Sequence, residues 1–216
     1  MGVVMEDSFF PENLTAGNVN QILKGIYRTW DEKRYDALLK QFSIPKGKII
    51  REYSKGMKMK LSIVAALTHD SKLLILDEAT NGLDPVTRDE ILDVFMEFIQ
   101  DESHSVFISS HILSDLEKIS DYITFIHKGE IVFSKSKDDL LDTHGILKCS
   151  EKDFLRINPQ AVKGYRKNHF GIEALVVKDM VRGDYLIDHA GIEDIMLFHV
   201  ASSNGRQLGD VKTKGY

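Results

Sequence analysis

The stretch Lys72-Leu73-Leu74-Ile75-Leu76-Asp77-Glu78-Ala79-Thr80 places four consecutive apolar residues before two adjacent carboxylates. This form is typical of a buried parallel strand that carries acids at its carboxyl end. Open α/β sheets bind their ligands at that end. In proteins that hydrolyse nucleotides, the first acid of such a pair, here Asp77, typically holds Mg²⁺, and the second, here Glu78, orients or deprotonates the attacking water. The alternative is that the two acids only cap the next turn or helix.

A second segment, just upstream, predicts a helix over residues 54–69. Ser54 is a good N-cap, and the apolar side chains that follow it fall near helical spacing. One interpretation is an amphipathic core helix. The other is that Ser54, the flexible Gly56 and the first helical amides form an anion site, because a helix amino terminus offers unpaired N–H groups and a positive dipole.

Four motifs in order resemble those of the ATP-binding cassette (ABC) ATPases. Residues 53–57 (YSKGM) resemble the signature loop, which is of the LSGGQ type, and they precede the acidic strand as they do in that family. Downstream, residues 81–85 (NGLDP) resemble the D-loop, and residues 108–111 (ISSH) resemble the switch-histidine segment. With the acidic strand these make the four motifs. As a fifth match, residues 1–6 followed by residues 13–15 (NLT) resemble the segment around the Q-loop, where the family usually has Gln and this chain has Glu6.

The resemblance implies a division of labour between two such domains packed head to tail, each supplying its signature loop to a nucleotide held mainly by the other. By analogy, Asp77 would organise Mg²⁺, Glu78 would act on the water, and His111 would contact the γ-phosphate of ATP. Asp84 would communicate between the two sites. The full set of further nucleotide-binding residues implied by the resemblance is Ser54, Lys55, Gly56, Met57, Glu6 and Asp84.

A phosphate-cradling loop of the form G-x-x-x-x-G-K-[ST] does not occur in the sequence. The Gly-Lys pair at residues 47–48 has Phe42 where the first glycine belongs and Ile49 where the hydroxyl belongs. In the family this loop lies upstream of the Q-loop, so the resemblance covers most of residues 1–133 and begins in mid-domain. The backbone amides and the lysine of this loop supply most of the electrostatic attraction for ATP. Without them, we expect the isolated chain to be poorly active or inactive. Either the sequence starts late, which the strand-like residues 2–4 favour, or the chain is a shortened homologue that supplies a signature surface to a partner.

The composition agrees with this interpretation but does not establish it. The chain has 216 residues, of which 43% are hydrophobic and 28% charged, as in an ordinary soluble globular protein. With a net charge of −5, the composition shows no excess of basic residues that would bind nucleic acid, so we expect no nucleic-acid partner. The single cysteine, Cys149, suits a reducing cytoplasm. The sequence shows no apolar run of membrane-spanning length, so we expect any membrane connection to come through a partner.

The periodicity predicts an α/β fold: a parallel sheet of the P-loop NTPase type (ABC ATPase) with a helical subdomain, incomplete at the N-terminus, plus a small C-terminal α/β extension. We expect a partial ATPase domain over 1–134, with its helical subdomain at about 14–69, an extension over 135–201, and a disordered tail over 202–216. Predicted helices cover residues 16–30, 32–42, 54–69, 85–100, 111–119, 151–157 and 192–200. Predicted strands cover residues 72–77, 105–110, 122–127, 130–134, 146–149, 174–177 and 185–187.

Three other features suggest functions that we consider weaker. His104 and His111 could form a metal pair, but they lack a third ligand. Ser110 next to His111 could be a nucleophile and its base, but neighbours on a strand point to opposite faces. The basic and aromatic segment 163–169 could touch lipid or RNA, and we expect a solvated loop there instead.

Two classes of function remain. The preferred hypothesis is part of the ATP-hydrolysing subunit of an ABC transporter, with ATP and Mg²⁺ as cofactors. Its expected partners are a transmembrane permease and a second ABC ATPase protomer, identical or different, and its expected location is the cytoplasm, at the inner face of the membrane. The alternative is a non-catalytic interaction protein that contributes a signature surface to an intact ABC ATPase. A cassette ATPase of DNA repair or translation is a third possibility that no coiled coil or basic stripe supports.

Overall fold

The computed structural model describes residues 1–7 and 9–203, with side chains through residue 200. The chain divides into two compact units, Met1–Ile119 and Ser120–Tyr216. The sequence suggests a boundary near Ser134, whereas this division comes earlier. The difference arises because Ile123 and Phe133, on either side of a hairpin turn, belong to the core of the second unit. Most of the expected disordered tail over 202–216 lies outside the described residues.

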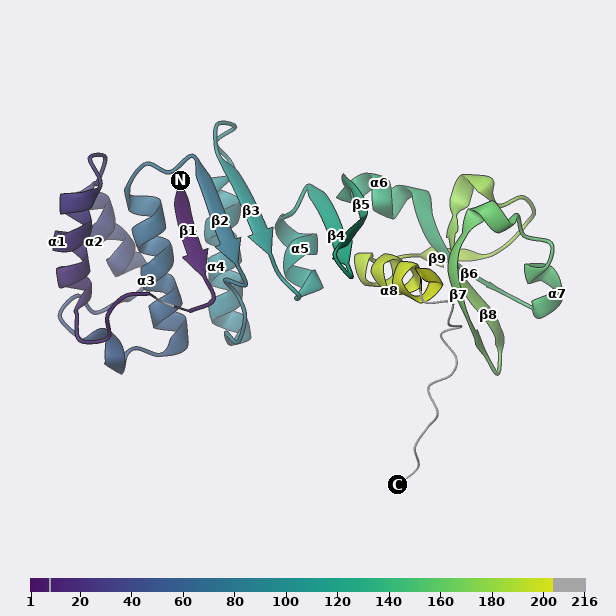
Figure 1. Ribbon diagram of the computed structural model, residues 1–216, viewed down its shortest axis with the longest axis horizontal. Coiled ribbons are helices and arrows are strands. Elements are labelled where there is room, and N and C mark those ends of the chain that lie inside the picture. Colours follow the sequence, from purple (N-terminus) through teal and green to yellow (C-terminus); the bar gives the residue numbers. More distant parts are fainter. Residues whose placement is uncertain (8, 204–216) are drawn as a thin grey trace, which may run out of the picture. The chain divides into compact units, whose positions relative to one another are not determined.

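The first unit is built on a parallel sheet whose strands are in the order β1-β2-β3 (Figure 1). The strands are β1 (Gly2–Met5), β2 (Leu73–Asp77) and β3 (Ser105–Ser109). In the register, Asp77 lies between Met5 and Ser109, so the carboxyl ends of all three strands meet at one edge. The parallel sheet predicted from the apolar run before Asp77 is confirmed.

Four helices of the first unit begin at side-chain caps. Thr15 forms a capping box with Asn18, and Asp31, Ser54 and Asp84 accept backbone N–H bonds at the starts of the next three helices. The helical elements of this unit are α1 (Ala16–Ile26), α2 (Glu32–Gln41), η1 (Ile50–Glu52), α3 (Lys55–Thr68), α4 (Pro85–Phe98) and α5 (Leu113–Ile119).

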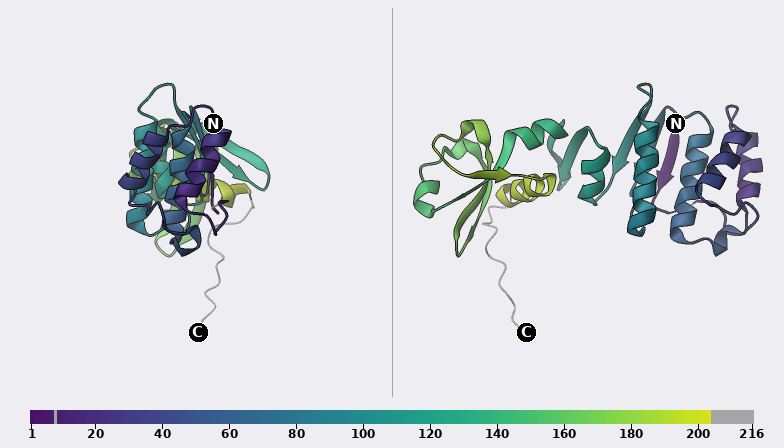
Figure 2. Two further views of the ribbon diagram at one scale, coloured as in Figure 1. Left: turned by 90° about the vertical axis from the view of Figure 1, so that its left-hand side faces the viewer. Right: turned by 180° about the vertical axis from the view of Figure 1, so that it is seen from behind.

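Two helices cover one face of this sheet. Leu74 and Leu76 of β2 share a buried cluster with Ile63 of α3 and Phe95 of α4, and the right-hand view of Figure 2 shows α4, in teal, in front of the sheet. The start of β1 lies very close to α3, since a Cβ atom at Gly2 would be 2.8 Å from the Ala66 carbonyl oxygen. A second cluster joins α1 and α2 to α3 and forms the core of the predicted helical subdomain.

The opposite face of the sheet carries an exposed apolar row. Val3, Ile75 and Phe107 stand side by side in the strand register. Val3 is 49% exposed and Phe107 is 68% exposed. Within the described part of the chain, β3 pairs with β2 alone, so its other edge also presents unpaired backbone groups.

The second unit is an antiparallel α/β fold. Its elements are β4 (Tyr122–His127), β5 (Glu130–Ser136), α6 (Lys137–Thr143), β6 (His144–Cys149), α7 (Glu151–Phe154), η2 (Pro159–Ala161), β7 (Val162–Asn168), β8 (Gly171–Val177), η3 (Lys178–Met180), β9 (Ile187–His189) and α8 (Ile192–Ser203). Strands β4 and β5 form a hairpin, and the other four pair in the order β7-β8-β6-β9. Helix α8 contacts β7 and β8.

The expectation of a solvated loop over residues 163–169 is wrong, because most of that segment belongs to β7. Although several of its side chains are charged, the segment forms an antiparallel strand that pairs with β8 from Val162 to Asn168, with a register shift between Val162 and Gly164. Arg166 Nε donates a hydrogen bond to Glu173 Oε2 across the two strands at 2.5 Å. Cross-strand pairing therefore accounts for Arg166, and Lys167 Nζ lies 2.6 Å from Glu151 Oε1 of α7.

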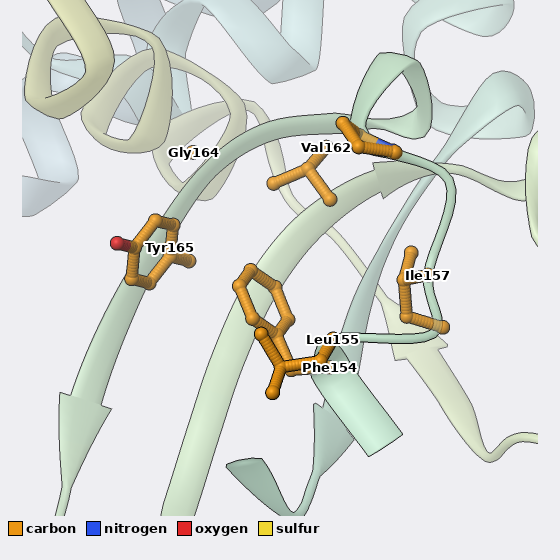
Figure 3. Close-up of a pocket in the computed structure, with 7 residues that line it drawn as sticks. Phe154, Leu155, Ile157, Val162, Gly164 and Tyr165 are labelled. Carbon is orange, nitrogen blue, oxygen red and sulfur yellow. The ribbon is translucent and has the colours of Figure 1, made fainter. Parts of the chain in front are cut away.

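The second unit also holds an apolar hollow of about 390 Å³ (Figure 3). Its lining residues are Phe154, Leu155, Ile157, Pro159, Val162, Gly164 and Tyr165. Every residue predicted to contact a nucleotide lies in the first unit, so this hollow belongs to a different part of the chain. No helix among the described residues is both long and apolar enough to span a lipid bilayer.

Candidate functional site

The carboxyl edge of the sheet brings Asp77 and Ser109 together. These residues end neighbouring strands and are register partners. Ser109 Oγ donates a hydrogen bond to Asp77 Oδ1 at 2.5 Å. The hydroxyl therefore fixes one carboxylate oxygen and leaves the other to face a ligand. The sequence identifies Asp77 as a site residue, but it assigns Ser109 no part.

Glu78 lies in the turn directly after β2, in a backbone conformation that is unusual for its residue type. Its φ is +50°, in the left-handed region, which costs a non-glycine residue roughly 1 to 2 kcal/mol. Two backbone hydrogen bonds hold this turn: Glu78 N–H donates to the Ser109 carbonyl at 3.1 Å, and Asn81 N–H donates to the Glu78 carbonyl at 3.0 Å. Such strain is typical of positions where a side chain must be aimed.

His111 reaches Glu78 from the neighbouring strand connection. Its Nδ1–H donates to Glu78 Oε2, and the two atoms are 2.7 Å apart. The sequence places His111 at the start of a helix, whereas α5 begins at Leu113, so the imidazole stands on the turn between β3 and α5. With Nδ1 committed to Glu78, Nε2 is the imidazole atom left to meet a substrate. The structure thus joins the two residues predicted to be catalytic.

The donor set at this edge fits Mg²⁺. Asp77, Glu78 and Ser109 offer carboxylate and hydroxyl oxygens, which are the hard ligands that Mg²⁺ prefers. Among the described residues, no group of three or more His, Cys, Asp or Glu side chains is placed to hold a metal ion by itself. Magnesium in nucleotide-hydrolysing sites takes one or two carboxylates and completes its shell with phosphate oxygens and waters. Asp77 suits that arrangement, since its carboxylate is already held by Ser109.

The signature-like segment forms the exposed start of α3. Ser54 is the N-cap, and its Oγ accepts a hydrogen bond from Met57 N–H at 3.2 Å. Tyr53 anchors the segment to the core, because its ring is buried and its hydroxyl donates to the Pro45 carbonyl at 2.7 Å. Ser54 and Lys55 are exposed, while Gly56 and Met57 are partly buried. The first two residues of the segment's helix start, Ser54 and Lys55, are therefore open to solvent.

The starts of α3 and α4 meet at Thr87. A Cβ atom at Gly56 would lie 3.1 Å from Thr87 Cγ2, so glycine permits the close approach. Asp84 caps α4 by accepting a hydrogen bond from Thr87 N–H at 3.0 Å. That backbone bond holds the pKa of Asp84 below its ordinary value. Asp84, predicted for communication between sites, thus has a structural task as an N-cap in this chain.

Glu6 connects the sheet edge to the Asn81 turn. It follows β1, and its Oε1 accepts a hydrogen bond from Asn81 Nδ2 at 2.5 Å. The same oxygen lies 3.9 Å from Lys55 Nζ. The predicted residues therefore fall into two groups: Asp77, Glu78 and His111 around the ends of β2 and β3, and the remainder around the starts of α3 and α4.

Comparison with known proteins shows where this chain has relatives. Residues 1–81 match the family model described as ABC transporter. The bacitracin transport ATP-binding protein BcrA of Enterococcus faecalis is 38% identical over 136 residues, which are 61% of this chain and 44% of BcrA. A putative ABC transporter ATP-binding protein of Mycoplasma pneumoniae is 46% identical over 107 residues, covering 49% of this chain and 33% of the relative. The lantibiotic transport ATP-binding protein SrtF of Streptococcus pyogenes is 44% identical over 41% of this chain and 38% of SrtF.

Solved structures give the same result for the fold. The ATP-binding subunit of an ABC transporter matches with a TM-score of 0.57 and 26% identity, over 65% of this chain and 60% of the other. The ATP-binding cassette MJ0796, a dimer bound to ADP and Pi, matches with a TM-score of 0.55 and 21% identity, over 62% of each chain. The chain spans less than half the length of the three curated relatives, as the 44%, 33% and 38% shares show.

Proposed function

Because this chain belongs to the ATP-binding proteins of the ABC transporter family, we propose that it is part of the ATP-hydrolysing subunit of a transporter. The relatives named for bacitracin and lantibiotic transport support a role in transport. In this proposal two ATPase protomers enclose ATP between them, and the MJ0796 dimer is the related arrangement. Their closing and reopening would drive a permease.

The observation that carries this proposal is the contact between Glu78 and His111. A carboxylate and an imidazole 2.7 Å apart, beside Asp77, supply the acid, the base and the cation ligand that ATP hydrolysis needs. These groups come from neighbouring strands at the ligand-binding edge of a parallel sheet. An acid pair that served only as a cap would not require the imidazole.

Each residue has a distinct task in the proposed reaction. Mg²⁺, when bound, would neutralise charge on the phosphate oxygens. Asp77 would hold the metal in the orientation that Ser109 imposes. Glu78 would accept a proton from the attacking water. His111, protonated on both ring nitrogens, would donate from Nδ1 to Glu78 and from Nε2 to a terminal phosphate oxygen. Ser54 and Gly56 would contact the nucleotide of the partner protomer.

A hollow beside the sheet edge supports the proposed contact with a permease. It has a volume of about 300 Å³ and lies between β1, α1 and α3. Among its lining residues, Val3, Met5, Phe9 and Tyr27 are exposed apolar or aromatic side chains. An apolar segment of a membrane protein fits such a surface. The subunit would then work in the cytoplasm, held at the inner face of the membrane by its partner.

A second candidate function follows from two features of this chain. Ser54 and Lys55 are exposed, and the Ser54 side chain caps α3. A chain of this kind could associate with an intact ABC ATPase and complete its site with a signature surface. It would then regulate ATP turnover without performing it.

One experiment tests the shared core of both candidates. Mixing the chain with purified BcrA of Enterococcus faecalis and measuring ATP turnover should show a change that depends on the amount of chain added. Ser54→Arg should abolish that change, because a bulky cation would fill the space at the start of α3. Unaltered turnover at every ratio would contradict an interaction at this surface.

A matched control separates the surface effect from loss of a helix cap. Ser136 caps α6 in the second unit, where its Oγ accepts a hydrogen bond from Asp139 N–H at 3.1 Å. Ser136→Arg therefore removes an equivalent cap, worth about 1 kcal/mol, away from the proposed site. It should leave the effect on BcrA intact.

A further inference from the structure

Two positions at which the chain departs from the family pattern are in contact. Glu6 stands where the Q-loop usually has Gln, and Lys55 stands where the LSGGQ pattern has its first glycine. Lys55 Nζ lies 3.9 Å from Glu6 Oε1. A negative charge in one loop is thus matched by a positive charge in another, although neither charge belongs to the usual pattern.

A third segment completes this arrangement. Glu6 also accepts the 2.5 Å hydrogen bond from Asn81 Nδ2. Gly82, the next residue, has a φ of +67°, and a Cβ atom there would lie 2.8 Å from Lys55 Nζ. The ammonium group therefore rests against the bare Cα of Gly82. Glu6 and the turn at Asn81 and Gly82 together form a seat for Lys55.

The seat holds Lys55 only weakly. The side chains of Lys55 and Glu6 are 47% and 45% exposed, and exposed pairs of this kind contribute little to stability. A terminal phosphate carries more negative charge than a carboxylate, so it attracts the ammonium group of Lys55 more strongly. The amides at the start of α3 also favour an anion beside Lys55. The hydrogen bond from Asn81 keeps Glu6 in place when Lys55 leaves.

Resting on the proposed function, we propose that Lys55 and Glu6 form a releasable latch. In the free chain Lys55 is tied to Glu6 over the Asn81 turn. When the two protomers close, Lys55 transfers to the terminal phosphate of the nucleotide held by the partner. The latch makes closure depend on the third phosphate of ATP, and the charge of Glu6 opposes closure until that phosphate arrives.

The first test measures the latch in the full chain alone. Reductive methylation with formaldehyde, read for each lysine by mass spectrometry, reports how available each ammonium is. Glu6→Gln preserves the acceptor for Asn81 but removes the charge, and it should raise the methylation rate of Lys55 two- to fivefold. Unchanged labelling of Lys55 would overturn the latch.

A matched surface pair provides the control. Lys46 Nζ lies 2.7 Å from Asp36 Oδ1, with side chains 50% and 49% exposed. Asp36→Asn should therefore free Lys46 for methylation as Glu6→Gln frees Lys55. Unlike Glu6→Gln, it should leave binding to a partner subunit unchanged.

The second test measures transfer to the phosphate. BcrA is loaded with ATPγS or with ADP, and its dissociation constant with this chain is measured for each variant. Glu6→Gln should tighten binding to the ATPγS form three- to tenfold, and Lys55→Met should weaken it about tenfold, with little change for the ADP form. The double variant should behave as Lys55→Met does. BcrA with ATPγS should also protect wild-type Lys55 from methylation.

The outcomes separate the latch from the proposed function. If Glu6→Gln and Lys55→Met shift the affinity in the same direction, the transfer of Lys55 is wrong. If the wild-type chain binds neither form of BcrA, the proposed function fails and the transfer fails with it. In that case increased methylation in Glu6→Gln still identifies an internal ion pair, so the two failures are told apart.

Discussion

The Nδ1 atom of His111 lies 2.7 Å from Oε2 of Glu78, which joins the turn after β3 to the turn after β2. Because these turns follow adjacent parallel strands, their separation is set by the strand register and not by the length of the intervening helix. Any change that shifts β3 along β2 would therefore separate the imidazole from the carboxylate.

The proposed role of Glu78 as the general base predicts a large kinetic effect. In a chain completed ahead of residue 1 with a P-loop segment from an intact ABC ATPase, Glu78→Gln should lower ATP turnover about 100- to 10,000-fold. ATP binding should remain, since the amide keeps the size of the side chain. Steady-state hydrolysis and nucleotide titration measure both effects. Glu102→Gln, at an exposed loop position, is the control, and equal turnover in Glu78→Gln and wild type would refute the assignment.

The hydrogen bond from Ser109 predicts an effect on the metal requirement. Ser109→Ala frees the Asp77 oxygen that the hydroxyl now holds, and loss of such a supporting contact typically costs about 10- to 100-fold in metal affinity. In the completed chain, the Mg²⁺ concentration for half-maximal turnover should rise accordingly. Ser110→Ala removes a neighbouring hydroxyl that accepts from Ile112 N–H, and it should leave the Mg²⁺ requirement as it is.

The exposed row on the sheet predicts self-association of the isolated chain. Val3 and Phe107 leave apolar surface open beside the unpaired edge of β3, and such edges recruit further strands. Phe107→Ser should reduce the apparent mass by light scattering at a fixed protein concentration. Phe170→Ser is the control, because Phe170 is 99% exposed on a hairpin turn of the second unit. A wild-type chain that stays monomeric would contradict this prediction.

The second unit should lose stability in mild acid. Burial lowers the pKa of His144 and of His199, and nearby Lys135 and Lys163 lower both further. The unfolded chain takes up these protons near pH 6.5, whereas the folded unit takes them up only at lower pH. Their contribution is therefore complete above about pH 6.5 and declines as the pH falls below that value.

Urea unfolding between pH 7.5 and 5.5, followed by a signal from the second unit, measures this decline. Replacing both His144 and His199 with Gln should flatten the dependence on pH. His169→Gln, at an exposed position, should leave the slope unchanged. A slope that persists in the double variant would show that other groups are responsible.

The sequence predicts the parts of the fold that depend on local patterns. The apolar run before Asp77 predicts β2, and the cap at Ser54 and the proline in the first turn at Pro85 predict the starts of α3 and α4, because each signal lies within a few residues. The end of α1 is less accurate. The helix stops at Ile26 and not at residue 30, since the backbone of Tyr27 is extended.

The contacts within the candidate site were only partly predictable. Parallel strands that end in polar residues place Asp77 near the end of β3, so Ser109 could have been found from the register. The contact between Glu6 and Lys55 could not, because it depends on how two flexible side chains cross between distant segments. Segment 163–169 was missed for a related reason: the sequence pattern does not identify its partner strand β8, where Glu173 pairs with Arg166.

Because the backbone of Glu78 is left-handed, the residue that would make this position most stable differs from the residue that catalysis would require. Glycine there would relax the turn and raise the melting temperature, while deleting the carboxylate that faces His111. A library of variants selected only for heat resistance would therefore be enriched in Glu78→Gly, and selection for ATP turnover in the chain completed with a P-loop segment would restore glutamate. The two selections would pull this position in opposite directions.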